Sequence, residues 1–190
     1  MHKIESFALS SGSKISKPFI NELYFPLVEE KYICISKSSK FPSEHYDFFD
    51  DVAFHINPYL EKNNIKLIQI GAASDLPIYY TKNFNFLNIN QAAYVIKNSL
   101  MYVGNLNIYS NIASMFNKKM VCPSRVNYIE SIRPYWSKKS ECKIIQSKRK
   151  NFKPVLAPQE SPKTINDVYP EAIGKAILDS LKIKNNLNKL

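Results

Sequence analysis

Side chains that could carry out acid–base or metal chemistry are scattered along this 190-residue sequence. The three histidines, His2, His45 and His55, lie far apart, and no two carboxylates have a spacing that suggests acid–base catalysis. The three cysteines lack the close spacing of metal ligands. We therefore predict no metal site and no cofactor, and the residue pattern by itself identifies no catalytic residue.

Small residues, however, follow two of the predicted buried strands. The apolar strand 65–70 ends in Gly71, and the apolar strand 100–103 ends in Gly104. Glycine at such a position lets the backbone turn sharply or approach a ligand. Ligands of parallel α/β sheets bind at the carboxyl ends of the strands, so both glycines predict a ligand-binding edge. Asp75, which follows Gly71 closely, is more typical of a turn residue than of a ligand.

The stretch 88–124 contains the elements that would position Gly104. A strand, a sharp turn, a helix and a second strand within this length form a βαβ crossover, which builds parallel sheets. The apolar spacing predicts a helix through Ala92–Ile96, a strand over 100–103, a helix over 108–116 and a strand over 120–122 that Pro123 ends.

The rest of the chain continues the alternation of strands and helices, which predicts an α/β fold with one parallel sheet. We expect an irregular N-terminal arm over 1–30, one domain over 31–183 and a frayed tail over 184–190. Within the domain, the sequence predicts a strand over 31–36, a helix from Glu44 towards Leu60 with Ser43 as N-cap and Pro58 as a kink or break, strands over 65–70, 85–87 and 142–146, and a final helix from Pro170.

The formal net charge of +10 does not by itself indicate a nucleic-acid partner. Only three residues are arginines, and the excess of Lys, Asn, Ile and Tyr is typical of an AT-rich genome. Specific recognition of bases depends on bidentate arginine contacts. We interpret the basic cluster 148–150 as a solvated loop and predict no specific nucleic-acid partner.

The sequence predicts neither a membrane-spanning segment nor a signal peptide, because no apolar run is long enough and the N-terminus has no apolar segment. Cys34 and Cys122 lie inside predicted buried strands, where free thiols pack as small apolar groups. Free thiols indicate a reducing compartment, so we expect a cytoplasmic protein.

Several strings, taken in their order along the chain, resemble a known family over about 31–181. The chain resembles the C-terminal, donor-binding half of bacterial heptosyltransferase-like enzymes, glycosyltransferase family 9, which have the two-lobed GT-B fold. The strings are the loop Lys40-Phe41-Pro42, the strand end Ile70-Gly71, the helix Asn90–Ser99, the turn Val103-Gly104 followed by Ile112-Ala113, and the helix start Pro170-Glu171.

The resemblance implies a Rossmann-like, three-layer α/β half-domain of GT-B type that binds a nucleotide-sugar without a cofactor. Helix N-termini bind anions in general, and the family holds the donor diphosphate at the turn that corresponds to the one after Gly104. The residues that the resemblance assigns to donor and phosphate binding are Ser38, Lys40, Gly71, Gly104, Asn105, Asn107 and Asn111.

The chain departs from the family at this same turn. Leu106 stands where the family has Asp, Asn107 where it has Ser, Ile108 where it has Gly, and Asn111 where it has His. The family's general base also belongs to the N-terminal lobe, which this sequence lacks. Two hypotheses follow: a glycosyltransferase lobe that acts with a partner chain supplying the acceptor lobe, or a catalytically degenerate binding or scaffold module that pairs with another chain or with itself.

Overall fold

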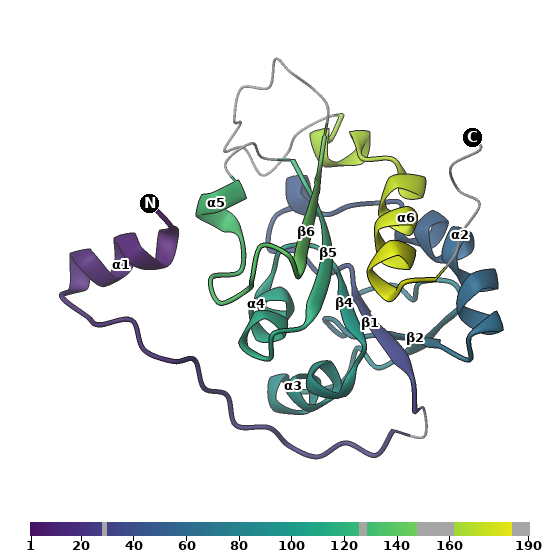
Figure 1. Ribbon diagram of the computed structural model, residues 1–190, viewed down its shortest axis with the longest axis horizontal. Coiled ribbons are helices and arrows are strands. Elements are labelled where there is room, and N and C mark those ends of the chain that lie inside the picture. Colours follow the sequence, from purple (N-terminus) through teal and green to yellow (C-terminus); the bar gives the residue numbers. More distant parts are fainter. Residues whose placement is uncertain (28–29, 126–128, 148–161, 184–190) are drawn as a thin grey trace.

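The computed structural model describes residues 1–27, 30–125, 129–147 and 162–183, and contains one six-stranded sheet (Figure 1). The strand order is β3-β2-β1-β4-β5-β6, and every neighbouring pair is parallel. The strands are β1 Tyr32–Ser36, β2 Lys66–Gln69, β3 Thr81–Asn83, β4 Met101–Gly104, β5 Lys119–Ser124 and β6 Cys142–Gln146.

Helices cover both faces of the sheet, so the fold has three layers. Helices α2 (Phe49–Lys62) and α6 (Pro170–Leu181) pack on one face, and α3 (Ile89–Asn98) and α4 (Ile108–Met115) pack on the other (Figure 1). Successive side chains of a strand point to opposite faces. Ile33 therefore packs with α2 and α6, whereas Cys34 packs with α3 and α4. The predicted three-layer α/β architecture is confirmed.

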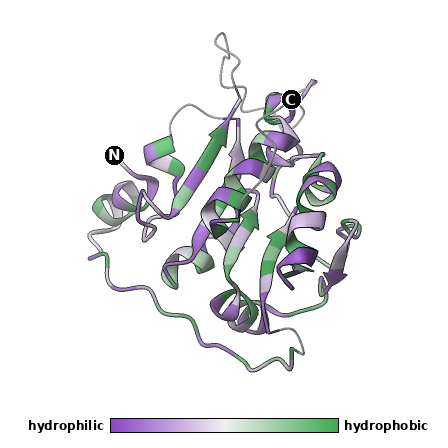
Figure 2. Cartoon of the chain, turned by 45° about the vertical axis from the view of Figure 1, so that its right-hand side comes forward, coloured by the Kyte–Doolittle hydropathy of each residue, from purple (hydrophilic) through white to green (hydrophobic). Residues whose placement is uncertain are grey.

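The central strands are apolar on both faces, as Figure 2 shows by their green colour. Every residue of β1 and β4 is buried. This is the pattern of parallel strands covered by helices on both faces. It explains why these strands read as continuous apolar runs in the sequence.

The N-terminal arm is not irregular throughout, because it begins with the helix α1 (Lys3–Ser11). The His2 ring accepts a hydrogen bond from the Ile4 amide, and the Glu5 carboxylate accepts one from the His2 amide, forming a capping box. Gly12 ends the helix in the left-handed conformation. The sequence did not reveal α1, whose apolar residues Ile4, Phe7 and Ala8 form only a short stripe that the fold does not bury.

After α1, the arm is extended and runs along the layer that contains α3. Phe25 packs edge-to-face on Phe84, with ring centroids 5.2 Å apart, and the Leu23 amide donates to the Asn90 carbonyl. Glu22 forms an ion pair with Lys97 at 2.6 Å. Residues 20–27 of the arm therefore pack on the sheet domain, whereas most side chains of 11–19 are exposed.

The first long helix begins later than predicted. Residues Pro42–Glu44 form only the 3₁₀ turn η1, and α2 starts at Phe49, so the prediction of Ser43 as its N-cap is wrong. The physical reason is Tyr46, which leaves the helical path to bury its ring completely. Its hydroxyl donates to the Val168 carbonyl at 2.7 Å.

Two strand boundaries also differ from the prediction. The strand predicted over 85–87 lies instead at 81–83, because 84–87 form a turn in which the Leu87 amide donates to the Phe84 carbonyl. Strand β5 continues through Pro123 to Ser124. It can do so because the pairing with β4 ends at Val121, so that Pro123 has only β6 as a neighbour.

Three short elements complete the described chain: α5 (Ile129–Ile132), η1 and η2 (Thr164–Asp167). The predicted tail 184–190 and the basic cluster 148–150 lie outside the described residues. Among the residues that are described, no helix is long and apolar enough to cross a membrane.

Candidate functional site

The strand order reverses its direction between β1 and β4. From β1 the chain builds outward through β2 and β3, and it then returns to add β4, β5 and β6 on the other side. In open parallel sheets of this order, ligands bind in the crevice at the carboxyl ends of the two strands that flank the reversal. The loops that leave β1 and β4 therefore form the candidate site.

Gly104 permits the close approach of these two strands. Its φ angle is +153°, and a Cβ atom built on it would collide with the carbonyl oxygen of Ser36 in β1. The amide of the next residue, Asn105, donates to that same carbonyl at 3.2 Å. The glycine predicted to form the turn is thus required by packing of backbone against backbone.

The Asn105 side chain joins the loop after β4 to the loop after β1. It is completely buried, and its amide group donates to the Lys37 carbonyl at 2.7 Å. Its oxygen accepts a hydrogen bond from the Tyr46 amide. These hydrogen bonds position the two crevice loops. The side chain that the resemblance assigned to donor binding is therefore engaged in bonds within the protein.

Asn107 is the N-cap of α4, and its side-chain oxygen accepts hydrogen bonds from the Tyr109 and Ser110 amides. The same oxygen accepts one from the Tyr102 hydroxyl at 3.0 Å, and the side-chain amide donates to the Ser38 carbonyl at 2.9 Å. Asn107 therefore orders the N-terminus of α4 against the β1 loop.

Ser38 and Gly71 meet at the carboxyl ends of β1 and β2. The Ser38 hydroxyl donates to the Asp75 carboxylate. The Ala72 amide donates both to the Ser38 hydroxyl oxygen and to an Asp75 carboxylate oxygen, each at 3.0 Å. A Cβ atom on Gly71 would collide with Asp75 and lie 2.8 Å from the Ser38 hydroxyl. Asp75 therefore closes the turn after Gly71, as a turn residue is expected to do.

A buried acceptor lies beside this cluster and has no hydrogen-bond partner. The Asn85 amide group donates to the Asp75 carbonyl at 2.9 Å, while its oxygen is buried and unpaired. A buried, unpaired acceptor is costly, so such an atom marks a place where a donor group fits. Nothing in the sequence marks Asn85 as a site residue, because it lies inside the strand predicted over 85–87.

Lys40 and Asn111 are the two predicted side chains that stay exposed. The Lys40 ammonium lies 5.4 Å from the centroid of the Phe41 ring, and its side chain extends from the β1 loop. The Asn111 amide group donates to the Asn107 carbonyl at 3.2 Å, one turn into α4. Of the seven predicted residues, these two are best placed to contact a ligand directly.

A charged cluster borders the crevice at η1. Lys163 forms an ion pair with Asp47 at 2.6 Å, and Asn166 donates to the same carboxylate at 2.7 Å. Burial opposes ionisation of Asp47, but these partners outweigh it and lower its pKa. Burial and the Lys163 charge lower the pKa of His45, so its neutral form is favoured. Among the described residues, no group of three side chains could hold a metal ion.

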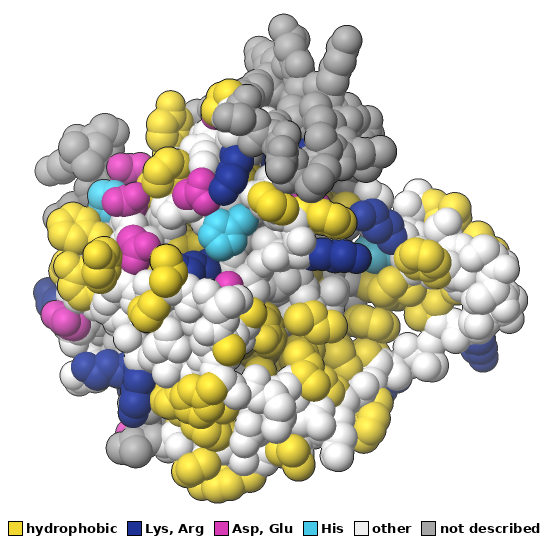
Figure 3. All heavy atoms as spheres, turned by 180° about the vertical axis from the view of Figure 1, so that it is seen from behind, with side chains coloured by type: hydrophobic (Ala, Val, Ile, Leu, Met, Phe, Trp, Pro, Cys, Tyr) yellow, Lys and Arg dark blue, Asp and Glu magenta, His cyan; other side chains and the backbone are white. Residues whose placement is uncertain are grey.

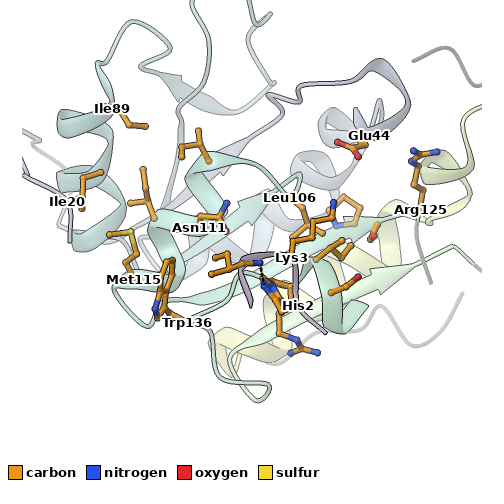
Figure 4. A pocket seen from close by; sticks show the side chains of 18 of the residues that line it. His2, Lys3, Ile20, Glu44, Ile89, Leu106, Asn111, Met115, Arg125 and Trp136 are labelled. Atoms are coloured by element: carbon orange, nitrogen blue, oxygen red, sulfur yellow. Dashed lines mark hydrogen bonds between the residues drawn. The ribbon is translucent and has the colours of Figure 1, made fainter. Parts of the chain in front are cut away.

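A pocket of about 720 Å³ lies beside α4, at the carboxyl end of β5. Its walls come from α1, the arm, α4, α5 and the end of β5, and Asn111 is the only predicted site residue that lines it. Figure 4 shows Trp136 and Met115 at one end of the pocket and Glu44 and Arg125 toward the other. Sequence analysis missed this pocket because its walls are far apart along the chain.

Solved structures that share this fold include heptosyltransferases. Escherichia coli ADP-heptose lipopolysaccharide heptosyltransferase II is 14% identical, with a TM-score of 0.58 over 82% of this chain and 48% of its own. Escherichia coli heptosyltransferase WaaC with ADP is 13% identical, with a TM-score of 0.59 over 93% of this chain and 54% of its own. A family 9 glycosyltransferase from Veillonella parvula is 12% identical, with a TM-score of 0.59 over 94% and 50%.

Neither a protein-family model nor a curated protein sequence matches the chain. Identities this low show the fold alone, and the chain spans about half the length of the structures it matches. Together with the strand order and the turn at Gly104, the comparisons give one conclusion. The chain has the fold of one half of a heptosyltransferase-like glycosyltransferase.

Proposed function

We propose that this chain is the donor lobe of a glycosyltransferase and binds a nucleotide-sugar in the crevice between β1 and β4. The observation that carries the proposal is the convergence of three separate segments at the reversal of the strand order. The segments are the β1 loop with Ser38 and Lys40, the strand end at Gly71, and the turn from Gly104 to Asn111.

The diphosphate would lie at the N-terminus of α4. The positive end of the α4 dipole favours an anion there, and the exposed Lys40 ammonium would supply a formal charge. The positive net charge of the chain would also attract an anionic ligand. Since the Asn105 and Asn107 amides already join the two loops, they would act by shaping the crevice, and Asn111 would contact the ligand.

Sugar transfer would need a second half that positions the acceptor, because deprotonation of an acceptor hydroxyl requires a base placed beside it. The solved structures that match are about twice as long as this chain, so transfer would use a second half like the one that they contain. The three buried free thiols fit a reducing compartment such as the cytoplasm.

Isothermal titration calorimetry tests donor binding. The titrants are ADP, UDP and their sugar conjugates, including ADP-D-β-D-heptose, which is bound in the solved structure of a further heptosyltransferase with a similar fold. We expect saturable heat with at least one of them. No heat with any titrant, at about 1 mM protein, would contradict the proposal.

Two lysine variants sharpen this test. Lys40→Ala removes a charge at the carboxyl edge, whereas Lys66→Ala removes an exposed lysine at the amino end of β2. We expect Lys40→Ala to weaken binding about tenfold and Lys66→Ala to leave it nearly unchanged. Equal effects of the two variants would indicate general attraction to a positive surface instead of a site.

A second candidate is a binding or scaffold module without transferase activity. The observation that favours it is the complete use of the Asn105 and Asn107 side chains in internal hydrogen bonds. This function predicts a stable assembly in sedimentation equilibrium or a partner recovered by pull-down, with no heat from nucleotide-sugars. A monomer without a recovered partner would contradict it.

A further inference from the structure

The pocket beside α4 has a chemistry that nucleotide binding in the β1/β4 crevice does not use. Most of its lining is apolar, and two of these side chains, Phe19 and Ile108, are 87% and 57% exposed. Its volume of about 720 Å³ lies within the range of small-molecule sites. Figure 3 shows hydrophobic side chains gathered in the hollow beside the N-terminal segment. An apolar ligand body would cover surface that is otherwise exposed to water.

The charges around the pocket are mainly positive. Lys3, Arg125 and Arg133 line it, and Glu44 is the single carboxylate among the described lining residues. The Arg133 charge is partly balanced by Glu130, which lies 3.4 Å away. A cationic head group would therefore be repelled at this pocket, and an anionic one attracted.

Helix α1 forms one wall of the pocket without belonging to the core. It contributes Lys3 and Ile4 to the lining, but none of its residues is buried. Its attachment includes a hydrogen bond between the His2 Nε2 atom and the Arg133 carbonyl at 2.7 Å, and a ring contact with Tyr135 at 4.9 Å. A short helix with few packed side chains gains little stability by itself, so a ligand in the pocket would complete its packing.

We propose that this pocket binds an amphiphilic anion, with the apolar chain along α4 and the anionic head near Lys3 and Arg125. The proposal does not rest on nucleotide-sugar binding, because the charges that would hold the head group, Lys3 and Arg125, lie outside the β1/β4 crevice. The pocket nevertheless adjoins the proposed donor site, since Leu106, Ile108 and Asn111 of the turn after Gly104 line it.

The single tryptophan of the chain, Trp136, lines the pocket and reports its occupancy. Tryptophan fluorescence is measured while dodecyl phosphate is added to the full chain, below the concentration at which it forms micelles. Dodecyltrimethylammonium has the same chain with the opposite charge, and inorganic phosphate has the head without the chain. We expect a saturable change with dodecyl phosphate at an affinity about tenfold or more above that of either control.

Two aspartate variants separate the pocket from the general surface. Ile108→Asp places a carboxylate in the pocket at the first residue of α4, where a negative charge suits the helix and the fold is kept. Leu76→Asp makes the same change at a side chain that is 73% exposed and does not line the pocket. We expect Ile108→Asp to abolish the saturable change and Leu76→Asp to retain it.

Equal affinity for the two head groups, no saturable change, or equal effects of the two variants would each overturn the proposal. A chain that binds ADP-sugars but fails this test loses the amphiphile site alone. A chain that binds dodecyl phosphate but no nucleotide keeps the amphiphile site and loses the proposed donor function.

Discussion

Gly104 is the residue on which the candidate crevice depends most directly. The backbone of β4 passes so close to the Ser36 carbonyl that no side chain fits between them. Gly12, at the end of α1, also has a positive φ angle, +64°, but open space lies around it. The two glycines therefore separate the cost of a strained backbone from the cost of a collision.

We expect Gly104→Ala to lower the free energy of unfolding by about 2–4 kcal/mol, because strain and collision add. Gly12→Ala, the control, has the strain alone and should cost about 1 kcal/mol or less. Urea unfolding followed by circular dichroism measures both. A Gly104→Ala protein as stable as the Gly12→Ala protein would contradict the close approach of β4 and β1.

Asn105 and Asn111 are predicted to differ in role. Asn105→Ala leaves the Lys37 carbonyl and the buried Tyr46 amide without their partner, and should cost about 2–4 kcal/mol of stability. Asn111→Ala removes one exposed hydrogen bond and should change stability by less than about 0.5 kcal/mol, while weakening ligand binding. Thermal unfolding and calorimetry of both variants check this. Comparable losses of stability in the two variants would contradict the different roles of Asn105 and Asn111.

Acidification should destabilise the protein through His45 and Asp47. The folded pKa of His45 lies below the ordinary value of 6.5, so below that pH the unfolded chain takes up a proton that the folded chain refuses. The contribution of Asp47 is present above its ordinary pKa of 3.8 and is lost as the pH falls through its lower folded pKa.

Urea unfolding at pH 7.5 and pH 5.5 tests the histidine part of this prediction. Stability should fall between the two values, and His45→Gln should make the fall smaller, since glutamine takes up no proton. A fall of the same size in the variant would assign the effect to other groups.

At this scale, the sequence predicted which residues gather at the sheet edge but not how their side chains are used. Glycines at two strand ends were readable because their role is local. The partners of Asn105 lie 68 and 59 residues away in the sequence, so its internal hydrogen bonds could not be foreseen. The unpaired oxygen of Asn85 is likewise a property of packing.

Among the elements, α1 is the one whose stability depends most on its ends. Its capping box and the His2–Arg133 hydrogen bond hold a helix that buries no residue. His2→Ala removes the cap and this attachment together, and should cost about 1 kcal/mol of local stability. Amides within α1 should then exchange with solvent about fivefold faster.

Hydrogen exchange of residues 4–12 measures this effect, with Lys14→Ala as a matched change in the exposed arm just beyond the helix. Unchanged exchange in His2→Ala, or an equal increase in both variants, would show that the helix is held by other contacts.

The elements with strong apolar patterns were predicted well, whereas helix α1 and the start of helix α2 were not. Strands β1, β4 and β5 and helices α3, α4 and α6 follow their apolar runs and periodicity. Helix α2 started late because the burial of Tyr46 outweighed the local helix signal. Helix α1 was missed because histidine is an unusual cap and the apolar stripe of the helix is short.

For the molecule as a whole, the strand order matters more than any single motif. A parallel sheet was predictable, whereas the order that brings β1 beside β4 is a property of the folded chain. That order places Ser38, Lys40, Gly71 and the turn at Gly104 on one edge, and it matches one half of the heptosyltransferase structures. The pocket beside α4 arises at the same scale, since α1, α4 and α5 meet only after folding.

A crystal structure of the chain soaked with ADP-D-β-D-heptose tests the central claim most directly. Our account predicts diphosphate density over residues 104–111, at the N-terminus of α4, with the Lys40 ammonium within reach of a phosphate oxygen. Density for the nucleotide at another surface, or an empty crevice at saturating ligand, would contradict it.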